Sequence, residues 1–295
     1  MTTDQLTRTV DALSIGIPKH WGALTLFPLY RHDPVSVDVL PASLALESGR
    51  LHISESTHAT VPTLLAKNDT GTTVLFVAGE MVFGGKQDRM LTDSLLISPG
   101  EWDVPVACVE SGRWSGDAHF DRRTGLGPRQ VRQGPIVGRG HRGVSQGVVW
   151  ESVEQTLHDA DTPHAGSEWR AALDRSTNGV TELGPLPGQC GVAIGKGQRV
   201  IGVELFADHR ALASYWSSII GSYALDNVRA YEGRPSLGAV LRFIRKAAAE
   251  LEPIASAGPG RQLRHATHSR AGTALLTVET PIDPGTLVHL AVLAG

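Results

Sequence analysis

Short apolar segments of strand type, separated by turn signals, fill the first third of the sequence. They are WGALTLFPLY (21–30), SVDVL, LHIS, TLLAKN, TVLFVAG, SLLIS and DVPVACVE. Turn-forming sequences lie between some of them, Asn-Asp-Thr-Gly at 68–71 and Ser-Pro-Gly at 98–100. This spacing is typical of an antiparallel sandwich or barrel. Residues 41–47 can instead form a short helix.

Helical periodicity replaces this pattern in the second half of the chain. Asp208 is placed to cap one helix, with Leu212 and Trp216 on its apolar face, and Ser236 to cap another that ends before Pro253. Strand-like segments return near the C-terminus. The order predicts an α+β fold: an antiparallel β-sandwich or barrel-like N-terminal part, helices in the second half, and C-terminal strands that return to a sheet.

Glycine and arginine are concentrated in residues 111–147, which hold nine glycines and seven arginines against two aspartates. A connection of this length without clear periodicity is typically functional or disordered. We therefore expect four regions: an N-terminal arm (1–20), a β-rich part (21–110), a Gly/Arg-rich loop (111–147), and an α+β part (148–295) packed as one domain with 21–110. The loop is interpreted as a lid over an anionic ligand, as a contact with a second subunit, or as a solvated segment.

The net charge of −3 gives no global attraction to nucleic acid or to an anionic membrane, so neither is predicted as a partner. The N-terminal sequence lacks the features of a signal peptide, and no apolar run is long enough to span a bilayer. A cytoplasmic location is the simplest expectation. The two cysteines, Cys108 and Cys190, cannot form a disulfide framework. A homo-oligomer is left open.

The first candidate site is GEMVFGGKQDR, residues 79–89. Gly84 and its neighbour Gly85 allow positive φ and a close backbone approach to a ligand. Lys86 and Arg89 suit phosphate or carboxylate, with Gln87 between them. Glu80 can act as a base or bind a pair of ribose hydroxyls. The alternative is a β-turn with solvated charges. The segment is not a P-loop, because the GxxxxGK(S/T) spacing is absent.

The second candidate site is CVESGRW, residues 108–114. Strand alternation places Cys108 and Glu110 on one face, and Arg113 and Trp114 follow the strand end. A nearby carboxylate opposes formation of a thiolate, so we predict that Cys108 is packed in the interior or lines a ligand site, and is not a nucleophile. The Asp and His residues of 117–121 and the HxxH pair at 265 and 268 are not predicted to bind a metal.

Motifs that would define a reaction are absent from the sequence. There is no GxSxG, HExxH, paired CxxC, or GxGxxG after a strand, so serine hydrolases, zinc proteases, zinc ribbons and Rossmann dehydrogenases lack support. No cofactor is indicated, and whether the protein is an enzyme is left undecided.

With these motifs in view, the chain resembles a bacterial family named for its association with ADP-ribosylglycohydrolases and rhodanese-phosphatase-superfamily proteins. The resemblance covers roughly residues 20–295. It is carried by FPLY, by the run from VAGEMVFGGKQDR to CVESGRW, and by the later segments SQGVVWESV and GVELFADHRALASYWSSIIGSYALD. Two positions depart from the family pattern: Gly85 replaces alanine, and Asp88 replaces asparagine. The resemblance implies a setting in NAD-derived or ADP-ribose metabolism, without an established activity. The matching positions, carried over as the site, are Glu80, Gly84, Lys86, Gln87, Arg89, Cys108, Glu110, Arg113 and Trp114.

Two functions are compatible with these residues. In the first, the protein binds or hydrolyses a phosphorylated ribose, ADP-ribose or another NAD-derived molecule. Lys86, Arg89 and Arg113 would bind phosphate, Trp114 would stack on a base or sugar, and the catalytic candidates Glu80 and Glu110 would bind ribose hydroxyls or act as general acid and base. In the second, the protein is a non-enzymatic binding or assembly module.

Overall fold

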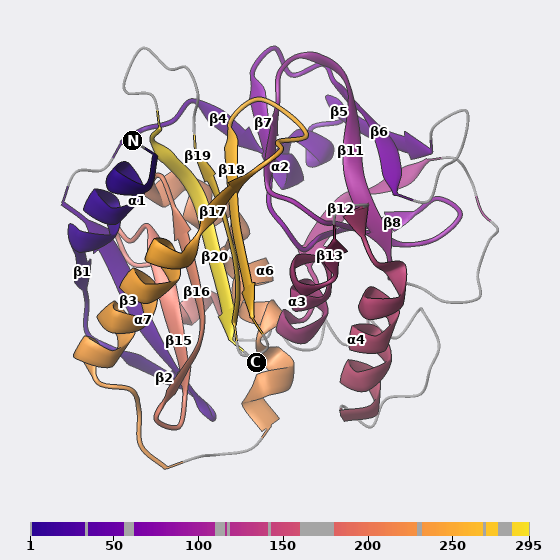
Figure 1. Ribbon diagram of the computed structural model, residues 1–295. Coiled ribbons are helices and arrows are strands. Elements are labelled where there is room, and N and C mark those ends of the chain that lie inside the picture. The colour runs from indigo at the N-terminus through magenta and orange to yellow at the C-terminus, as the bar shows by residue number, and fades with distance from the viewer. Residues whose placement is uncertain are drawn as a thin grey trace. The chain divides into compact units, whose positions relative to one another are not determined.

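The computed structural model describes residues 2–32, 35–55, 62–109, 116, 119–140, 143–159, 180–228, 232–267, 270–276 and 285–294. The chain divides into two compact units (Figure 1). Unit 1 comprises Met1–Val37, Asn178–Ala255 and Gly260–Gly295, and unit 2 comprises Asp38–Thr177 and Ser256–Pro259. Each unit therefore has its own core and is described separately.

Unit 1 is built on an antiparallel sheet with the strand order β1-β3-β15-β16-β20-β19-β18-β17, and β2 pairs with β3. The strands are β1 (Leu13–Ile15), β2 (Lys19–Trp21), β3 (Leu24–Arg31), β15 (Gly191–Lys196), β16 (Arg199–Phe206), β17 (Glu252–Ile254), β18 (Arg261–Thr267), β19 (Arg270–Leu276) and β20 (Leu287–Ala294). The early strand β3 thus pairs directly with β15, more than 150 residues later in the sequence. The sheet is assembled from both ends of the chain.

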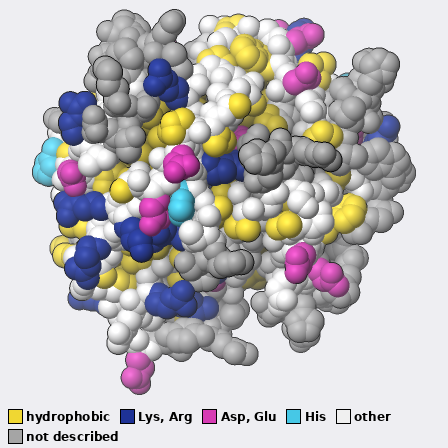
Figure 2. Space-filling model, viewed as in Figure 1, with side chains coloured by type: hydrophobic (Ala, Val, Ile, Leu, Met, Phe, Trp, Pro, Cys, Tyr) yellow, Lys and Arg dark blue, Asp and Glu magenta, His cyan; other side chains and the backbone are white. Residues whose placement is uncertain are grey.

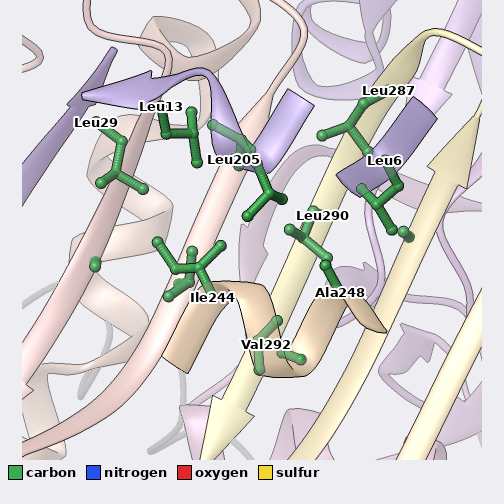
Figure 3. Close-up of a cluster of buried hydrophobic side chains, with 14 of the residues drawn as sticks. Leu6, Leu13, Leu29, Leu205, Ile244, Ala248, Leu287, Leu290 and Val292 are labelled. Carbon is green, nitrogen blue, oxygen red and sulfur yellow. The ribbon is translucent and has the colours of Figure 1, made fainter. Parts of the chain in front are cut away.

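Helices α1 (Thr2–Asp11) and α7 (Leu237–Glu250) pack against each other and share a core with the sheet. Leu6 of α1, Ile244 of α7 and Leu290 of β20 belong to this core (Figure 3). Along β16, Val203 and Leu205 contribute to it. Burial of this apolar layer is the main driving force that holds the two helices on the sheet.

Helix α6 (His209–Ser222) packs on β16, against the residues that alternate with the core residues Val203 and Leu205. The Phe206 and Tyr215 rings stack with centroids 5.6 Å apart. At Gly202, an added Cβ would lie 1.9 Å from the Tyr223 hydroxyl, so only glycine fits there. Short 3-10 helices at Val180–Leu183 (η1) and Ala224–Val228 (η2) flank α6.

The predicted helix caps are confirmed. Asp208 Oδ1 accepts a hydrogen bond from the Ala211 backbone N at 2.9 Å and begins α6. Ser236 Oγ accepts one from the Ala239 backbone N at 3.1 Å and begins α7. Each cap satisfies a backbone donor that the first helical turn leaves without an intrahelical partner.

Unit 2 contains a sheet with the strand order β12-β8-β9-β11-β6-β5. Its strands are β5 (Leu51–Glu55), β6 (Thr63–Asn68), β8 (Glu80–Gly84), β9 (Arg89–Leu91), β11 (Gly100–Cys108) and β12 (Phe120–Leu126). A bridge between Ser54 of β5 and His119, just before β12, joins the two edges. The sheet is therefore a nearly closed barrel, which protects the edges that an open sheet would expose.

A smaller sheet and several helices accompany the barrel. The smaller sheet has the order β10-β7-β4, from β4 (Val39–Pro41), β7 (Thr73–Phe76) and β10 (Leu95–Ile97), with β4 parallel to β7. Helix α2 (Ala42–Glu47) contacts both sheets, which confirms the short helix anticipated at 41–47. Helices α3 (Arg129–Val137) and α4 (Gln146–Asp159) pack together, and β13 (Arg139–Gly140) and β14 (Gly143–Val144) form a hairpin between them.

The predicted α+β class is confirmed. The sequence predicts either a sandwich or a barrel for the N-terminal part, and the structure has a barrel-like sheet there. Two regional expectations are wrong in the described residues. Residues 1–20 do not form a free arm, because α1 buries Leu6 and Val10, two apolar positions one helical turn apart in a polar sequence. The expected packing of 148–295 with 21–110 as one domain stays a prediction.

The second wrong expectation is the loop at 111–147, which contains β12, α3, β13 and β14. Its glycines permit close packing there. A Cβ at Gly134 would lie 3.3 Å from the Val149 Cα of α4, and one at Gly127 would lie 3.3 Å from the sulfurs of Met81 and Met90. Glycine content alone does not distinguish a tightly packed segment from a flexible one. No helix in the described part of the chain is long and apolar enough to cross a membrane.

Candidate functional site

Polar side chains gather at one end of the barrel. Because neighbouring strands are antiparallel, β5, β8 and β11 finish at the end where β6, β9 and β12 begin. The connections 56–62, 85–88 and 109–119 leave the barrel here. We call it the Arg89 end, after the buried arginine at the start of β9.

The apolar interior of the barrel becomes polar at the Arg89 end. Residues two apart on a strand share a face. Ile53 on β5, Leu91 on β9 and Val106 on β11 belong to the apolar core, and the next residues on the same faces are Glu55, Arg89 and Cys108. The interior rows of the three strands thus end in a carboxylate, a guanidinium and a thiol.

The Arg89 guanidinium connects these strands. Its side chain is 1% exposed, and its Nη1 donates a hydrogen bond to Gln87 Oε1 at 2.9 Å. Nη1 also contacts Cys108 Sγ, and Nη2 lies 3.6 Å from Glu55 Oε1. Glu55 Oε1 also accepts a hydrogen bond from the Lys86 backbone N at 3.2 Å. Because moving two charges out of water costs free energy, a buried ion pair of this kind adds little net stability, although removing one partner is strongly destabilising.

Cys108 has a buried thiol, and a side chain of α4 holds its backbone in place. Burial raises its pKa above the ordinary value of 9.0; the Arg89 charge offsets part of this rise and the Glu55 charge adds to it. The thiol is therefore protonated near neutral pH, which disfavours a nucleophilic role. Gln146, the first residue of α4, accepts from the Cys108 N at 3.0 Å and donates to the Cys108 O at 2.6 Å. The Gln146 amide thus pairs with the strand end as a neighbouring strand would.

The turn between β8 and β9 depends on its two glycines. Gly84 and Gly85 have φ of 114° and 57°. The Gly84 N donates to Asp88 Oδ1 at 2.8 Å, and the Gly85 N donates to the His119 O at 3.0 Å. An added Cβ at Gly85 would lie 2.4 Å from the Phe120 ring. Asp88 has a structural role here that the Oδ1 of an asparagine would fill equally.

Glu80 lies away from the Arg89 end. It begins β8, four residues before Gly84, which at the rise of an extended strand is about 13 Å along the barrel. Its side chain is buried, and Oε2 accepts a hydrogen bond from the Val77 N at 3.2 Å. The structure therefore brings Lys86, Gln87, Arg89 and Cys108 together and places Glu80 elsewhere.

Other predicted residues fall outside the described part of the chain or serve packing. Glu110, Arg113 and Trp114 belong to the connection between β11 and β12 and lie outside the described residues. Of the arginines interpreted as a lid, Arg129 and Arg132 are buried on α3, where Arg132 Nη2 donates to the Ala78 O at 3.4 Å. The side chains of the others, Arg122, Arg123, Arg139 and Arg142, are not among those described.

Sequence reasoning missed two residues at the Arg89 end, Glu55 and Gln146. Glu55 ends a strand 34 positions before Arg89, and Gln146 begins a helix 38 positions after Cys108. No local pattern connects residues so far apart, although the alternation of LHISE places Glu55 on the same face as Ile53. Among the described residues, no group of three or more His, Cys, Asp or Glu side chains is arranged to hold a metal ion.

Comparison with known proteins gives one match. The model of the ARG and Rhodanese-Phosphatase-superfamily-associated Protein domain matches residues 12–293, nearly the whole chain. No curated protein and no solved structure matches it.

Proposed function

Since this chain belongs to the ARG and Rhodanese-Phosphatase-superfamily-associated Protein family, we propose that it binds a phosphorylated ribose, such as ADP-ribose, at the Arg89 end of the barrel. The family name places its members in the company of ADP-ribosylglycohydrolases and rhodanese-phosphatase proteins. This company hints at an ADP-ribose setting and defines no reaction.

The observation that carries the proposal is the convergence of β5, β9 and β11 on the Arg89 guanidinium. Barrel mouths are common ligand sites, and there a few fixed polar groups on an apolar lining set the orientation of the ligand. Arg89 is fixed by Gln87, Glu55 and Cys108. Half-buried Lys86 follows on the adjoining turn and adds a second cation. Because Glu55 offsets the Arg89 charge, Lys86 would be the group that attracts a phosphate to this end.

The proposed role is binding, with no catalytic role for Glu80 at the Arg89 end. A glycosidic bond is cleaved by two carboxylates that flank it, which requires a separation of roughly 5–10 Å. Glu80 is about 13 Å along β8 from the Arg89 end and is engaged by the Val77 N. Its position favours a structural function in the turn that precedes β8.

Isothermal titration calorimetry with ADP-ribose, ribose 5-phosphate and NAD tests the proposal. Lys86→Ala should weaken binding of ADP-ribose about tenfold or more, because a hydrogen bond to a charged group contributes about 1.5–3 kcal/mol. Lys67→Ala is the matched control, since Lys67 is an exposed lysine of the same barrel that pairs with Asp69. The proposal fails if the parent protein binds none of the three, or if both variants bind like the parent.

A further inference from the structure

Unit 1 contains a pocket of about 230 Å³ beside helix α1. Its walls come from α1, from Arg31 at the end of β3, from Val35, and from Thr286 just before β20. None of these elements belongs to the barrel of unit 2. The pocket is therefore a feature separate from the Arg89 end.

One face of α1 forms a wall of the pocket. Gln5, Arg8, Thr9 and Ala12 line it, at the spacing of three and four residues that places side chains on one side of a helix. The neighbouring stripe, Leu6 and Val10, is buried in the core of unit 1. The core therefore fixes the rotation of α1, and with it the direction in which the polar stripe faces.

The described lining suits an anion. It contains two guanidinium groups, an amide and two hydroxyls, and none of the described lining residues is acidic. Arg31 is half-buried, and its Nη1 donates to the Ala207 O at 3.2 Å, which fixes one cation in the wall. A guanidinium has five N–H donors in a planar fork, so an arginine held in this way is suited to bidentate binding of an oxyanion. Figure 2 shows several Lys and Arg side chains, with some Asp and Glu among them, on the part of unit 1 that carries α1 and α7.

The segment before β20, which forms another wall, packs closely against α1. Gly285 has a φ of 94°, and a Cβ there would lie 2.3 Å from Gln5 Oε1. The absence of a side chain at 285 lets the backbone before β20 approach Gln5. Thr286, the next residue, is buried in the wall. Gln5 and Thr286 are thus positioned by packing, as a preformed site requires.

Size limits what the pocket can accept. Pockets for drug-sized ligands enclose about 300–1,000 Å³, and this one encloses about 230 Å³. That volume is small for a dinucleotide and suits a compact molecule. Two arginines favour a dianion over a monoanion, and a phosphate monoester carries about −1.5 to −2 at neutral pH. Hydroxyl and amide groups beside the cations suit a hydroxylated ligand body.

We propose that this pocket, between α1, the end of β3 and the segment before β20, binds a small phosphate monoester such as a sugar phosphate. Arg8 and Arg31 bind the phosphate, and Gln5, Thr9 and Thr286 bind its oxygens or the sugar hydroxyls. The site goes beyond the proposed function, because it lies in the other unit and has room for a smaller ligand.

Calorimetric titration with ribose 5-phosphate and with inorganic phosphate, at constant ionic strength, tests the site. Arg8→Ala should weaken binding at this site about tenfold or more. Arg31→Lys keeps the charge and loses the fork, so it should weaken binding less than Arg8→Ala does. Arg242→Ala removes an exposed arginine of α7 and should leave the affinity unchanged.

Three outcomes would overturn the proposal: no saturable binding of either phosphate probe, an equal effect of Arg8→Ala and Arg242→Ala, or tighter binding of the carboxylate malate than of ribose 5-phosphate. Lys86→Ala separates this site from the Arg89 end. Lys86→Ala should leave phosphate binding in the pocket beside α1 unchanged, whereas Arg8→Ala should weaken it. Each of the two proposals can therefore fail without the other. Circular dichroism of Arg8→Ala should match the parent, because Leu6 and Val10 still anchor α1.

Discussion

Cys108 and Arg89 stand directly opposite each other on β11 and β9, and the Arg89 guanidinium contacts the Cys108 thiol inside the barrel. Directly opposed residues of an antiparallel pair are the closest neighbours across a sheet. Glu55 of β5, a strand that pairs with neither β9 nor β11, contacts the same guanidinium. Several consequences of this arrangement can be measured.

Removing one partner of the buried ion pair should be strongly destabilising. Arg89→Met leaves the Glu55 carboxylate buried without its cation, and we expect a loss of about 3–5 kcal/mol in the free energy of unfolding. The double variant with Glu55→Gln should recover part of that loss, because it leaves no uncompensated charge. Urea unfolding of the two single variants and the double variant measures the coupling. Strictly additive losses would show that the two side chains do not interact.

The pKa of Cys108 should move in opposite directions when its two charged neighbours are neutralised. The Arg89 charge lowers this pKa and the Glu55 charge raises it. Arg89→Met should therefore raise it further above 9.0, and Glu55→Gln should lower it. Thiolate absorbance at 240 nm, recorded against pH in a Cys190→Ala background, reports the midpoint. Arg89→Lys is the control that keeps the charge. Shifts of the same sign in both neutralised variants would contradict the assigned contacts.

Cys190 should make stability depend on alkaline pH. Burial raises its pKa to about 11, so folding favours the protonated thiol. The resulting stability is fully present below about pH 9 and is lost as the pH rises toward 11. A difference of two pKa units corresponds to about 2–3 kcal/mol. The free energy of unfolding should fall more steeply over this range in the parent than in Cys190→Ala. Parallel curves for the two proteins would refute the buried thiol as the cause.

Gly85→Ala should be more damaging than Gly71→Ala. Both glycines have positive φ, 57° and 80°, so both substitutions incur the backbone cost of about 1–2 kcal/mol. A Cβ at Gly85 meets the Phe120 ring at 2.4 Å, whereas one at Gly71 meets nothing within 4 Å. The additional cost of overpacking is about 1–3 kcal/mol. Thermal unfolding of the two variants compares them, and equal losses would mean that Phe120 moves aside freely.

The candidate site was predictable from the sequence only in part. The local segment GEMVFGGKQDR predicted a turn with positive-φ glycines and clustered polar side chains, and Gly84, Gly85 and Lys86 are found in that turn. The same segment suggested that Glu80 shares the site. Glu80 instead lies at the other end of β8, because four residues of the extended strand separate it from Gly84. Residues only four positions apart on an extended strand are therefore too far apart in space to meet at one end of the barrel.

The sequence by itself determined the features that depend on neighbouring residues. The caps at Asp208 and Ser236 are contacts between a side chain and a backbone group three residues later, and the helical faces and strand alternation follow from fixed periods of 3.6 and 2. Such contacts require ordering only a few residues, so the local pattern is sufficient to specify them.

Only the tertiary structure decided which strands pair and in which register. The contacts of Arg89 with Glu55 and of Gln146 with Cys108 join residues more than 30 positions apart. A shift of one residue in the register of β9 would turn Arg89 out of the barrel and Met90 into it. The register depends on how the side chains of all the strands pack together in the interior, so the sequence of one segment is not sufficient to predict it.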